Sequence, residues 1–364
     1  MTTGRQGLGA APGSQAQGAG GHVTPPNGPA RAAGGQGGPE DPGTAGPPPP
    51  NAAYAGQTVN FPDPVRHSRH PRGVRVDADG YPDFSPYARA AAEIAEPPAG
   101  FGIDELRLTD YVSANAALHA DGHALWDTIP SVATPHGWTW HHVRGTRRLE
   151  LVPVEVKALL RHHGGLATTP VDQDKRGTRP LQETRPAHFR LPKGTPSVTE
   201  QQLLGVEEDL GYRLPGAYRS FLKAAGGCAP AGAALDAELG LLVDQPFLTV
   251  RDEAAVNDLL YVNKCLRDHL TKDYLGVAFV QGGILAVKVK GSAVGSVWFC
   301  AYDDARDRDG WGVQERVERL LLPCGDDFDG FLQRLAGNPP ELETVANLMV
   351  DGGFARAVPV SDEG

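Results

Sequence analysis

The segment 137–165 decides the fold in the middle of the chain, and it reads GWTWHHVRGTRRLELVPVEVKALLRHHGG. Trp and Thr near its start favour a strand, and the alternation at 149–152 predicts a second strand close behind it. Pro153 suits the first turn of a helix, which we expect to run to about His163 and to end at the glycine pair. Strand, turn, strand and helix in this order predict a ββα unit.

Toward the N-terminus, ordered sequence gives way to sequence that cannot form a core. A turn-rich run with aromatic anchors occupies 80–87, and a helix is expected near 104–118. Residues 1–60 are mostly Gly, Ala, Pro, Gln and Thr, with little apolar bulk to offset the backbone entropy of folding. We therefore expect a disordered tail at 1–60 and a folded domain at 74–170.

Toward the C-terminus, the region 195–340 has the pattern of a second domain with mixed helices and strands. The expected elements are a helix opened by a capping box at 197–200, a helix starting at Pro215, a strand near 247–250, a helix near 252–270, three β-rich runs at 276–280, 284–289 and 296–301, and a closing helix at 326–335. Glycines separate the three runs, which predicts an antiparallel meander. Residues 171–194 are interpreted as a linker and 341–364 as a weakly ordered tail.

The net charge of −10 hides an asymmetry between these regions. Residues 61–194 carry 17 Lys and Arg against 16 Asp and Glu, and ten of the twelve histidines. Residues 195–364 carry 15 Lys and Arg against 26 Asp and Glu, a net charge of −11. Basic segments attract phosphate backbones, and acidic partners can imitate those backbones. On charge alone, two solvated surfaces explain the pattern equally well.

The four cysteines, far apart and without a CxxC pair, are interpreted as reduced thiols. No secretory signal peptide and no stretch of 18 apolar residues is visible, so we expect no membrane partner. The expectation is a cytoplasmic protein, with export by a route that needs no N-terminal signal left open.

The region around the ββα unit resembles the WHH subgroup of the HNH/endonuclease VII nucleases. The matching features, in the family's order, are 80–87, Ala114-Asn115, 137–142, 151–153 and 162–165. Phosphodiester hydrolysis uses a base and a divalent cation, and a ββα unit can bring a strand histidine and a helix histidine around one cation. The resemblance implies a metal-dependent HNH-type endonuclease with DNA as candidate substrate, and leaves open whether this chain retains the activity.

The resemblance also assigns roles residue by residue. His142 matches the general base that polarises water, and His141 matches a ligand of a divalent metal ion of unknown identity. His162 matches the histidine before the double glycine, a second ligand or phosphate contact. One departure is Lys157, which stands where the family usually has a helix histidine. This departure matters because the lysine ammonium is a poor metal ligand. His163 is the candidate substitute ligand.

The region 195–335 resembles the SUKH superfamily, also called the SMI1/KNR4 domain. The matching features are 207–211, Leu214-Pro215, Tyr218, Phe221-Leu222, Gly226-Gly227, the three β-rich runs and the closing helix. Such domains in bacteria typically act as immunity proteins, which implies a nuclease toxin domain as partner, in cis or in trans. The expected fold class is α+β: a SUKH-like antiparallel sheet with flanking helices, preceded by a ββα-metal (HNH-like) domain and a disordered N-terminal tail.

An acidic loop in this second domain holds the candidate partner-binding residues, which are Asp303, Asp304, Asp307, Asp309 and Trp311. The loop is either a solvated turn or a surface that imitates DNA phosphate, with Trp311 as an interface anchor. Three hypotheses remain: a WHH-like nuclease fused to a SUKH domain that inhibits it, a non-catalytic binding protein whose nuclease-like half is degenerate, and a cytoplasmic regulatory module unrelated to toxins.

Overall fold

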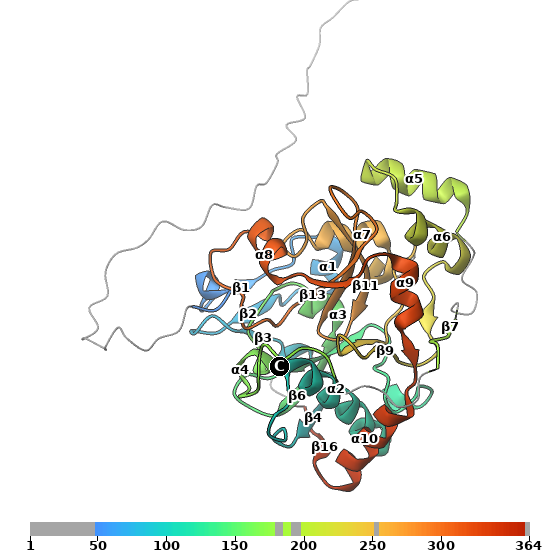
Figure 1. The fold of residues 1–364 in the computed structure, drawn as a ribbon. Coiled ribbons are helices and arrows are strands. Elements are labelled where there is room, and N and C mark those ends of the chain that lie inside the picture. Colours follow the sequence, from blue (N-terminus) through green and yellow to red (C-terminus); the bar gives the residue numbers. More distant parts are fainter. Residues whose placement is uncertain (1–47, 179–184, 191–197, 251–254, 361–364) are drawn as a thin grey trace, which may run out of the picture. The chain divides into compact units, whose positions relative to one another are not determined.

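Two antiparallel four-stranded sheets organise the part of the chain that the computed structural model describes, residues 48–178, 185–190, 198–250 and 255–360 (Figure 1). The strands are β1 (Thr58–Val59), β2 (Val74–Val76), β3 (Pro82–Asp83), β4 (Ala90–Ile94), β5 (Trp138–His142), β6 (Arg148–Pro153), β7 (Phe189–Arg190), β8 (Ala229–Pro230), β9 (Ala234–Asp236), β10 (Leu241–Val243), β11 (Tyr274–Val280), β12 (Gly283–Lys288), β13 (Val297–Ala301), β14 (Leu322–Gly325), β15 (Ala336–Gly337) and β16 (Ala355–Val358). The α-helices are α1 (Pro64–Arg69), α2 (Ile103–Ala120), α3 (Val154–Lys157), α4 (Gly165–Thr168), α5 (Glu200–Leu210), α6 (Gly216–Ala225), α7 (Leu259–Cys265), α8 (Val313–Leu320), α9 (Phe328–Arg334) and α10 (Pro340–Asp351), with 3-10 turns η1 (Ala52–Tyr54), η2 (Ser85–Tyr87), η3 (Ala124–Trp126) and η4 (Ala255–Asn257).

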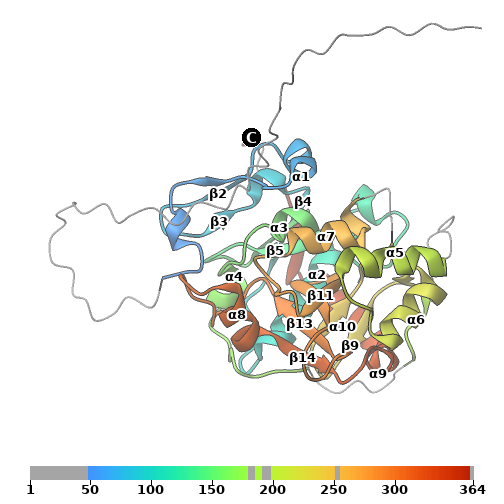
Figure 2. The same cartoon turned by 90° about the horizontal axis from the view of Figure 1, so that it is seen from above.

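The first sheet has the strand order β16-β4-β6-β5 and lies against α2. Acidic residues in the first turn of α2, Asp104 and Glu105, complement the helix dipole. One face of α2 packs Tyr111 and Leu118 with Trp140 and Leu151 of the sheet. On the other face of the sheet, Val152 of β6 joins an apolar cluster with Val74 and Val76 of β2 and Val156 of α3. Figure 2 shows β2 and α3 on the same side of the molecule as α1. The sheet is thus covered on both sides.

The expected ββα unit is present as β5, β6 and α3. The helix expected to reach His163 ends at Lys157, however, and that expectation was wrong. Backbone groups beyond it bond to distant residues instead: His269 Nε2 donates to the Ala158 carbonyl at 2.8 Å, and the His162 amide donates to the Tyr302 carbonyl at 2.9 Å. Long-range partners have replaced the helical hydrogen bonds.

The second sheet has the order β11-β12-β13-β14, and its first three strands are the predicted meander. Helix α5 begins with a capping box of Thr199 and Gln202, two residues after the box predicted from Ser197, and ends at Gly211 with φ 75°. Helices α6 and α9 occupy the predicted places. Around 247–250 only isolated bridges form, and the helix expected at 252–270 is the shorter α7; residues 251–254 lie outside the described part.

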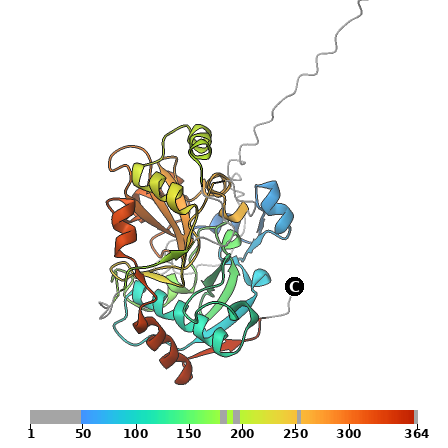
Figure 3. The ribbon, with the colours of Figure 1, turned by 90° about the vertical axis from the view of Figure 1, so that its right-hand side faces the viewer.

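The segment interpreted as a C-terminal tail instead forms α10 and β16, and β16 is a strand of the first sheet. Strand β16 pairs with β4 in the register Ala355 to Ile94, and α10 packs beside α2 (Figure 3). The helix buries Leu342 and Ala346. Residues 1–47 of the expected N-terminal tail lie outside the described part, and 48–60 contain η1 and β1.

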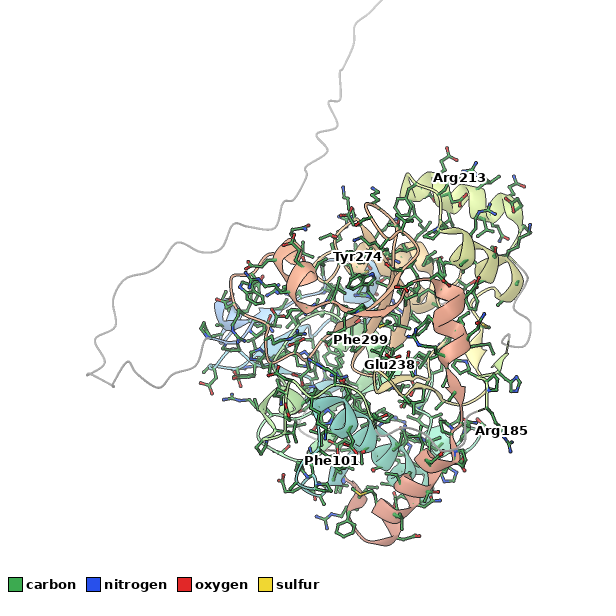
Figure 4. The ribbon with its side chains drawn as sticks, in the orientation of Figure 1. Phe101, Arg185, Arg213, Glu238, Tyr274 and Phe299 are labelled. Carbon is green, nitrogen blue, oxygen red and sulfur yellow. The ribbon has the colours of Figure 1, made fainter. Side chains whose placement is uncertain are left out.

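The two predicted domains share a core within one compact unit. Val154 and Ala158, after β6, belong to the apolar cluster of the second sheet. Leu108 and Val112 of α2 pack with Leu235 and Leu242 of the small sheet β10-β9-β15. The guanidinium of Arg107 lies 5.6 Å from the ring centre of Phe299. Figure 4 labels Phe299, which belongs to β13. The two regions therefore fold against each other.

Candidate functional site

Three histidines expected to act together are buried at the junction of the two regions. We call His141, His142 and His162 the histidine cluster; they are 6%, 3% and 1% exposed. The rings of His141 and His162 lie 5.2 Å apart, centre to centre, and Phe84 packs edge-on against both. Burial lowers the pKa of all three rings, that of His162 to about 4, so the cluster is uncharged at neutral pH.

His142, the proposed base, is oriented by a carboxylate that the sequence did not single out. Its Nε2 lies 3.0 Å from Asp110 Oδ2, and Asp110 Oδ1 accepts a hydrogen bond from Arg147 Nη2 at 2.6 Å. Asp110 is 1% exposed on α2. A carboxylate on one imidazole nitrogen fixes the ring and leaves the other nitrogen to accept a proton.

Lys157 places an ammonium beside the histidine cluster. Its side chain is 2% exposed, and Nζ donates to the backbone carbonyl of Trp140, one residue before His141. Burial lowers the pKa of Lys157 to about 8, while the charge of Asp303 raises it, so the ammonium form dominates at neutral pH. The site therefore contains a fixed positive charge.

A segment of the second region lies beside His162 of the histidine cluster. We call residues 302–309 the acidic strap. It runs alongside His162 through an isolated parallel bridge between His162 and Asp303. The Gly164 amide donates to Asp303 Oδ1 at 2.9 Å, and His163 Nε2 donates to the Asp307 carbonyl at 3.0 Å. The strap thus closes over the segment that follows α3.

A buried network around Asp307 also joins the two regions. Its carboxylate accepts from Arg161 Nε at 2.7 Å and from Arg316 Nε at 2.9 Å. Asp307 is 1% and Arg161 5% exposed. The two guanidinium groups outweigh the effect of burial and hold the pKa of Asp307 below its ordinary value.

Two of the remaining predicted partner residues, Asp304 and Trp311, contact residues of their own region. Asp304 accepts from Arg306 Nη2 at 2.7 Å, and Asp309 is partly exposed. The Trp311 ring lies under the Arg319 guanidinium, 4.9 Å from its carbon, on α8. Of the predicted acidic residues, Asp303 and Asp307 are the two whose contacts with 161–164 the structure shows.

The donor set at the histidine cluster does not fit a divalent cation in this closed arrangement. Two buried ring nitrogens, His141 Nδ1 and His162 Nε2, lack a hydrogen-bond partner within the described residues and would be available as ligands. These two nitrogens alone do not make a metal site. No group of three or more His, Cys, Asp or Glu in that same part of the chain is arranged to hold a metal ion. The charge of Lys157 lowers the pKa of both rings and would oppose a second cation there.

Sequence reasoning missed Asp110 and Arg161. Asp110 lies on a helix 32 residues before His142, and Arg161 lies 146 residues before Asp307. Their only local signal is a charged residue in an otherwise apolar stretch, as at Asp110 before Tyr111 and Val112.

The fold and the site define an α+β protein that joins a ββα unit to an antiparallel meander domain. Residues 130–172 match the WHH family, described as a nuclease of the HNH/ENDO VII superfamily with conserved WHH. Residues 197–334 match the SMI1/KNR4 family (SUKH-1). The chain therefore carries a WHH nuclease-family domain followed by a SUKH-1 domain, as the sequence predicted. No curated protein matches the chain at a significant level.

No helix of the described ranges is both long and apolar enough to cross a bilayer.

Proposed function

We propose that this chain is a toxin-immunity type protein in which the SUKH-1 domain inhibits the WHH nuclease domain of the same chain. The observation that carries the proposal is the acidic strap, which contacts Gly164 and Arg161, on either side of His162, through Asp303 and Asp307. Tethering raises the effective concentration of an inhibitor, so an intramolecular block can be nearly complete. The proposed domain boundaries are 74–170 and 195–340.

In the proposed reaction, His142 is the general base. With the strap displaced, its imidazole would take a proton from water as the water oxygen attacks phosphorus, and the phosphorus bond to the leaving oxygen would break. Asp110 would stabilise the imidazolium that forms. His141, His162 and His163 stay proposed ligands of a divalent metal ion, and DNA the proposed substrate, on the strength of family membership. Within the described residues, these histidines do not form a group of three or more donors arranged around a metal ion.

The second candidate is a non-catalytic SUKH binding protein with a degenerate nuclease half. Lys157 in the site and the complete burial of the histidine cluster favour this alternative. In either case a cytoplasmic location is proposed, which the four free cysteines support.

The test is to remove the acidic strap from the full chain. In one variant, residues 303–309 are replaced by a Gly/Ser linker of equal length; in a matched control, the exposed β12–β13 turn at 290–294 is replaced in the same way. Circular dichroism first confirms that both variants are folded. Plasmid cleavage is then measured with Mg²⁺, with Mn²⁺ and with EDTA.

We expect cleavage by the strap variant, none by the wild type or the turn control, and loss of cleavage when His142→Ala is added. A folded strap variant that cleaves nothing under any of these conditions would reject nuclease activity and leave the non-catalytic candidate. Cleavage that persists with His142→Ala would reject the assigned base.

A further inference from the structure

A cavity of about 830 Å³ lies beside helices α2 and α10, which run next to each other (Figure 3). Both helices and the segment before α2 supply apolar side chains to its lining, among them Phe101, Leu106, Leu108, Val112, Leu342 and Met349. Cavities of about 300–1,000 Å³ that are lined mainly by apolar side chains are typical binding sites for small molecules. The size and the lining therefore fit a small, largely apolar ligand.

Some apolar side chains of the lining are also exposed to solvent. Leu348 is 65% and Phe354 54% exposed, and both belong to the cavity. Val345, one turn before Leu348 on α10, is 37% exposed and lines the cavity as well. Exposed apolar side chains that lie together are typical of binding surfaces. A ligand in the cavity would remove part of this apolar surface from water.

One polar side chain of the lining has a donor without an acceptor. Arg147 lines the cavity, and its side chain is 11% accessible. Its Nε donates to the Ala95 carbonyl at 3.2 Å, and its Nη2 donates to Asp110 Oδ1 at 2.6 Å. Its Nη1 is buried and has no hydrogen-bond partner within the described residues. A buried donor without an acceptor is unfavourable, so a ligand that offers an acceptor to this guanidinium would gain affinity.

The charges around the cavity limit the chemistry of the ligand. Arg147 and Asp110 form an ion pair, so a neutral acceptor such as a carbonyl oxygen satisfies the remaining donor without adding a charge. Glu96 and Asp351 are exposed residues of the lining, and they would repel a ligand that carries a carboxylate. A cationic ligand would have to give up its hydration beside the Arg147 guanidinium.

We propose that this cavity binds a neutral, largely apolar molecule with one hydrogen-bond acceptor, which the Arg147 guanidinium receives. Long-chain ketones, alcohols and esters have this chemistry. Apart from Arg147, the residues that carry the proposal lie outside 130–172 and 197–334, the ranges matched by the two families. Binding in the cavity does not depend on the proposed nuclease activity.

The experiment uses the full chain and the neutral fluorescent probe N-phenylnaphthylamine, which has no carbonyl group and emits more strongly in apolar surroundings. We expect saturable binding of the probe to the wild type. Decan-2-one should displace the probe at a concentration about tenfold lower than decanoate or decylamine. The three competitors have the same chain length, so the comparison isolates the charge of the head group.

Matched substitutions locate the site. Thr109→Trp places an indole at a half-buried position of α2 that lines the cavity, and it should abolish saturable probe binding. Thr344→Trp, at an exposed position of α10 outside the lining, should leave the Kd of the probe unchanged. Arg147→Lys keeps the positive charge but loses the planar donor group, so it should weaken decan-2-one binding about tenfold and leave probe binding intact. Circular dichroism checks that each variant is folded. If Thr109→Trp is not, the competitor series on the wild type and Arg147→Lys decides.

The proposal is overturned if the wild type shows no saturable probe binding, if folded Thr109→Trp and Thr344→Trp bind the probe equally, or if decanoate or decylamine competes as well as decan-2-one. Unchanged decan-2-one binding by Arg147→Lys would also overturn it. Sedimentation velocity tests a second copy of the chain as the occupant. A dimer that Leu348→Ser dissociates would assign the exposed apolar side chains to self-association instead. No plasmid cleavage is measured, so the cavity and the nuclease activity are accepted or rejected separately.

Discussion

At the scale of single residues, the ion pair of Arg161 and Asp307 joins the acidic strap to the segment that follows α3. Both side chains are nearly inaccessible to solvent. Removing one charge therefore leaves the other unpaired in the protein interior, where water does not solvate it. Asp307→Asn should lower the free energy of unfolding by about 3–5 kcal/mol, measured by urea denaturation.

The matched control is Glu315→Gln, which breaks the exposed pair of Arg319 and Glu315, 59% and 40% accessible. Such pairs contribute about 0–1 kcal/mol, so little change is expected. Equal losses for the two variants would show that the Asp307 network is no stronger than a surface pair.

The buried histidines predict sensitivity to acid. The pKa of His162 is lowered to about 4 and that of His269 to about 3, in both cases mainly by burial. In the unfolded chain both histidines have a pKa near 6.5. Between pH 6.5 and 4 the unfolded state therefore binds protons that the folded state does not bind. The free energy of unfolding should fall over this window, by about 3 kcal/mol for His162 alone.

Urea denaturation at pH 7 and pH 4 measures this fall. His162→Gln should reduce it, whereas His119→Gln, at an exposed position, should not. Asp244 acts in the opposite direction, because burial raises its pKa to about 6 and the folded state takes up its proton first. Stability that stays constant from pH 7 to pH 4 would contradict the buried, neutral state of the histidines.

At the scale of elements, the edge strand β16 ties the end of the chain to the nuclease-family sheet. Ala355 is 3% exposed and faces the core, while its neighbour Arg356 points outward and pairs with Glu93. Ala355→Asp should cost about 3–5 kcal/mol, as an uncompensated buried charge does. Arg356→Ala should cost less than about 1 kcal/mol. Urea denaturation of both variants measures the contrast, and similar costs would mean that β16 is not anchored by this face.

The elements that the sequence predicted well are those whose signal is local. Helix α2, the strands β5 and β6 and the meander follow from periodicity and turn glycines within each segment. The helix after Pro153 stopped early because His269 and Tyr302 take its backbone groups, and these lie more than 100 residues away. The partner of Arg161, Asp307, is likewise more than 100 residues away in the sequence, so no local pattern could indicate it. Local patterns placed His141 and His142 on a strand but could not show what covers them.

At the scale of the whole molecule, the two domains share one apolar core, and we expect them to unfold together. Val154 and Ala158 lie in the core of the second sheet, and α10 and β16 return from the SUKH-1 region to the first. Separating the domains would expose this shared core, so activation by domain separation would require unfolding. We therefore expect release of the acidic strap to be a local opening.

Native-state hydrogen exchange by mass spectrometry tests this expectation. Peptides from α2 and β12 should become exchangeable at one common free energy, equal to that of global unfolding. The strap at 302–309 has few backbone bonds to regular structure and should open at a lower free energy. Asp307→Asn should lower the strap's opening free energy further, while Glu315→Gln leaves it unchanged. Different free energies for α2 and β12 would instead describe two independent domains, and the nuclease-family site would then be uncovered by their separation.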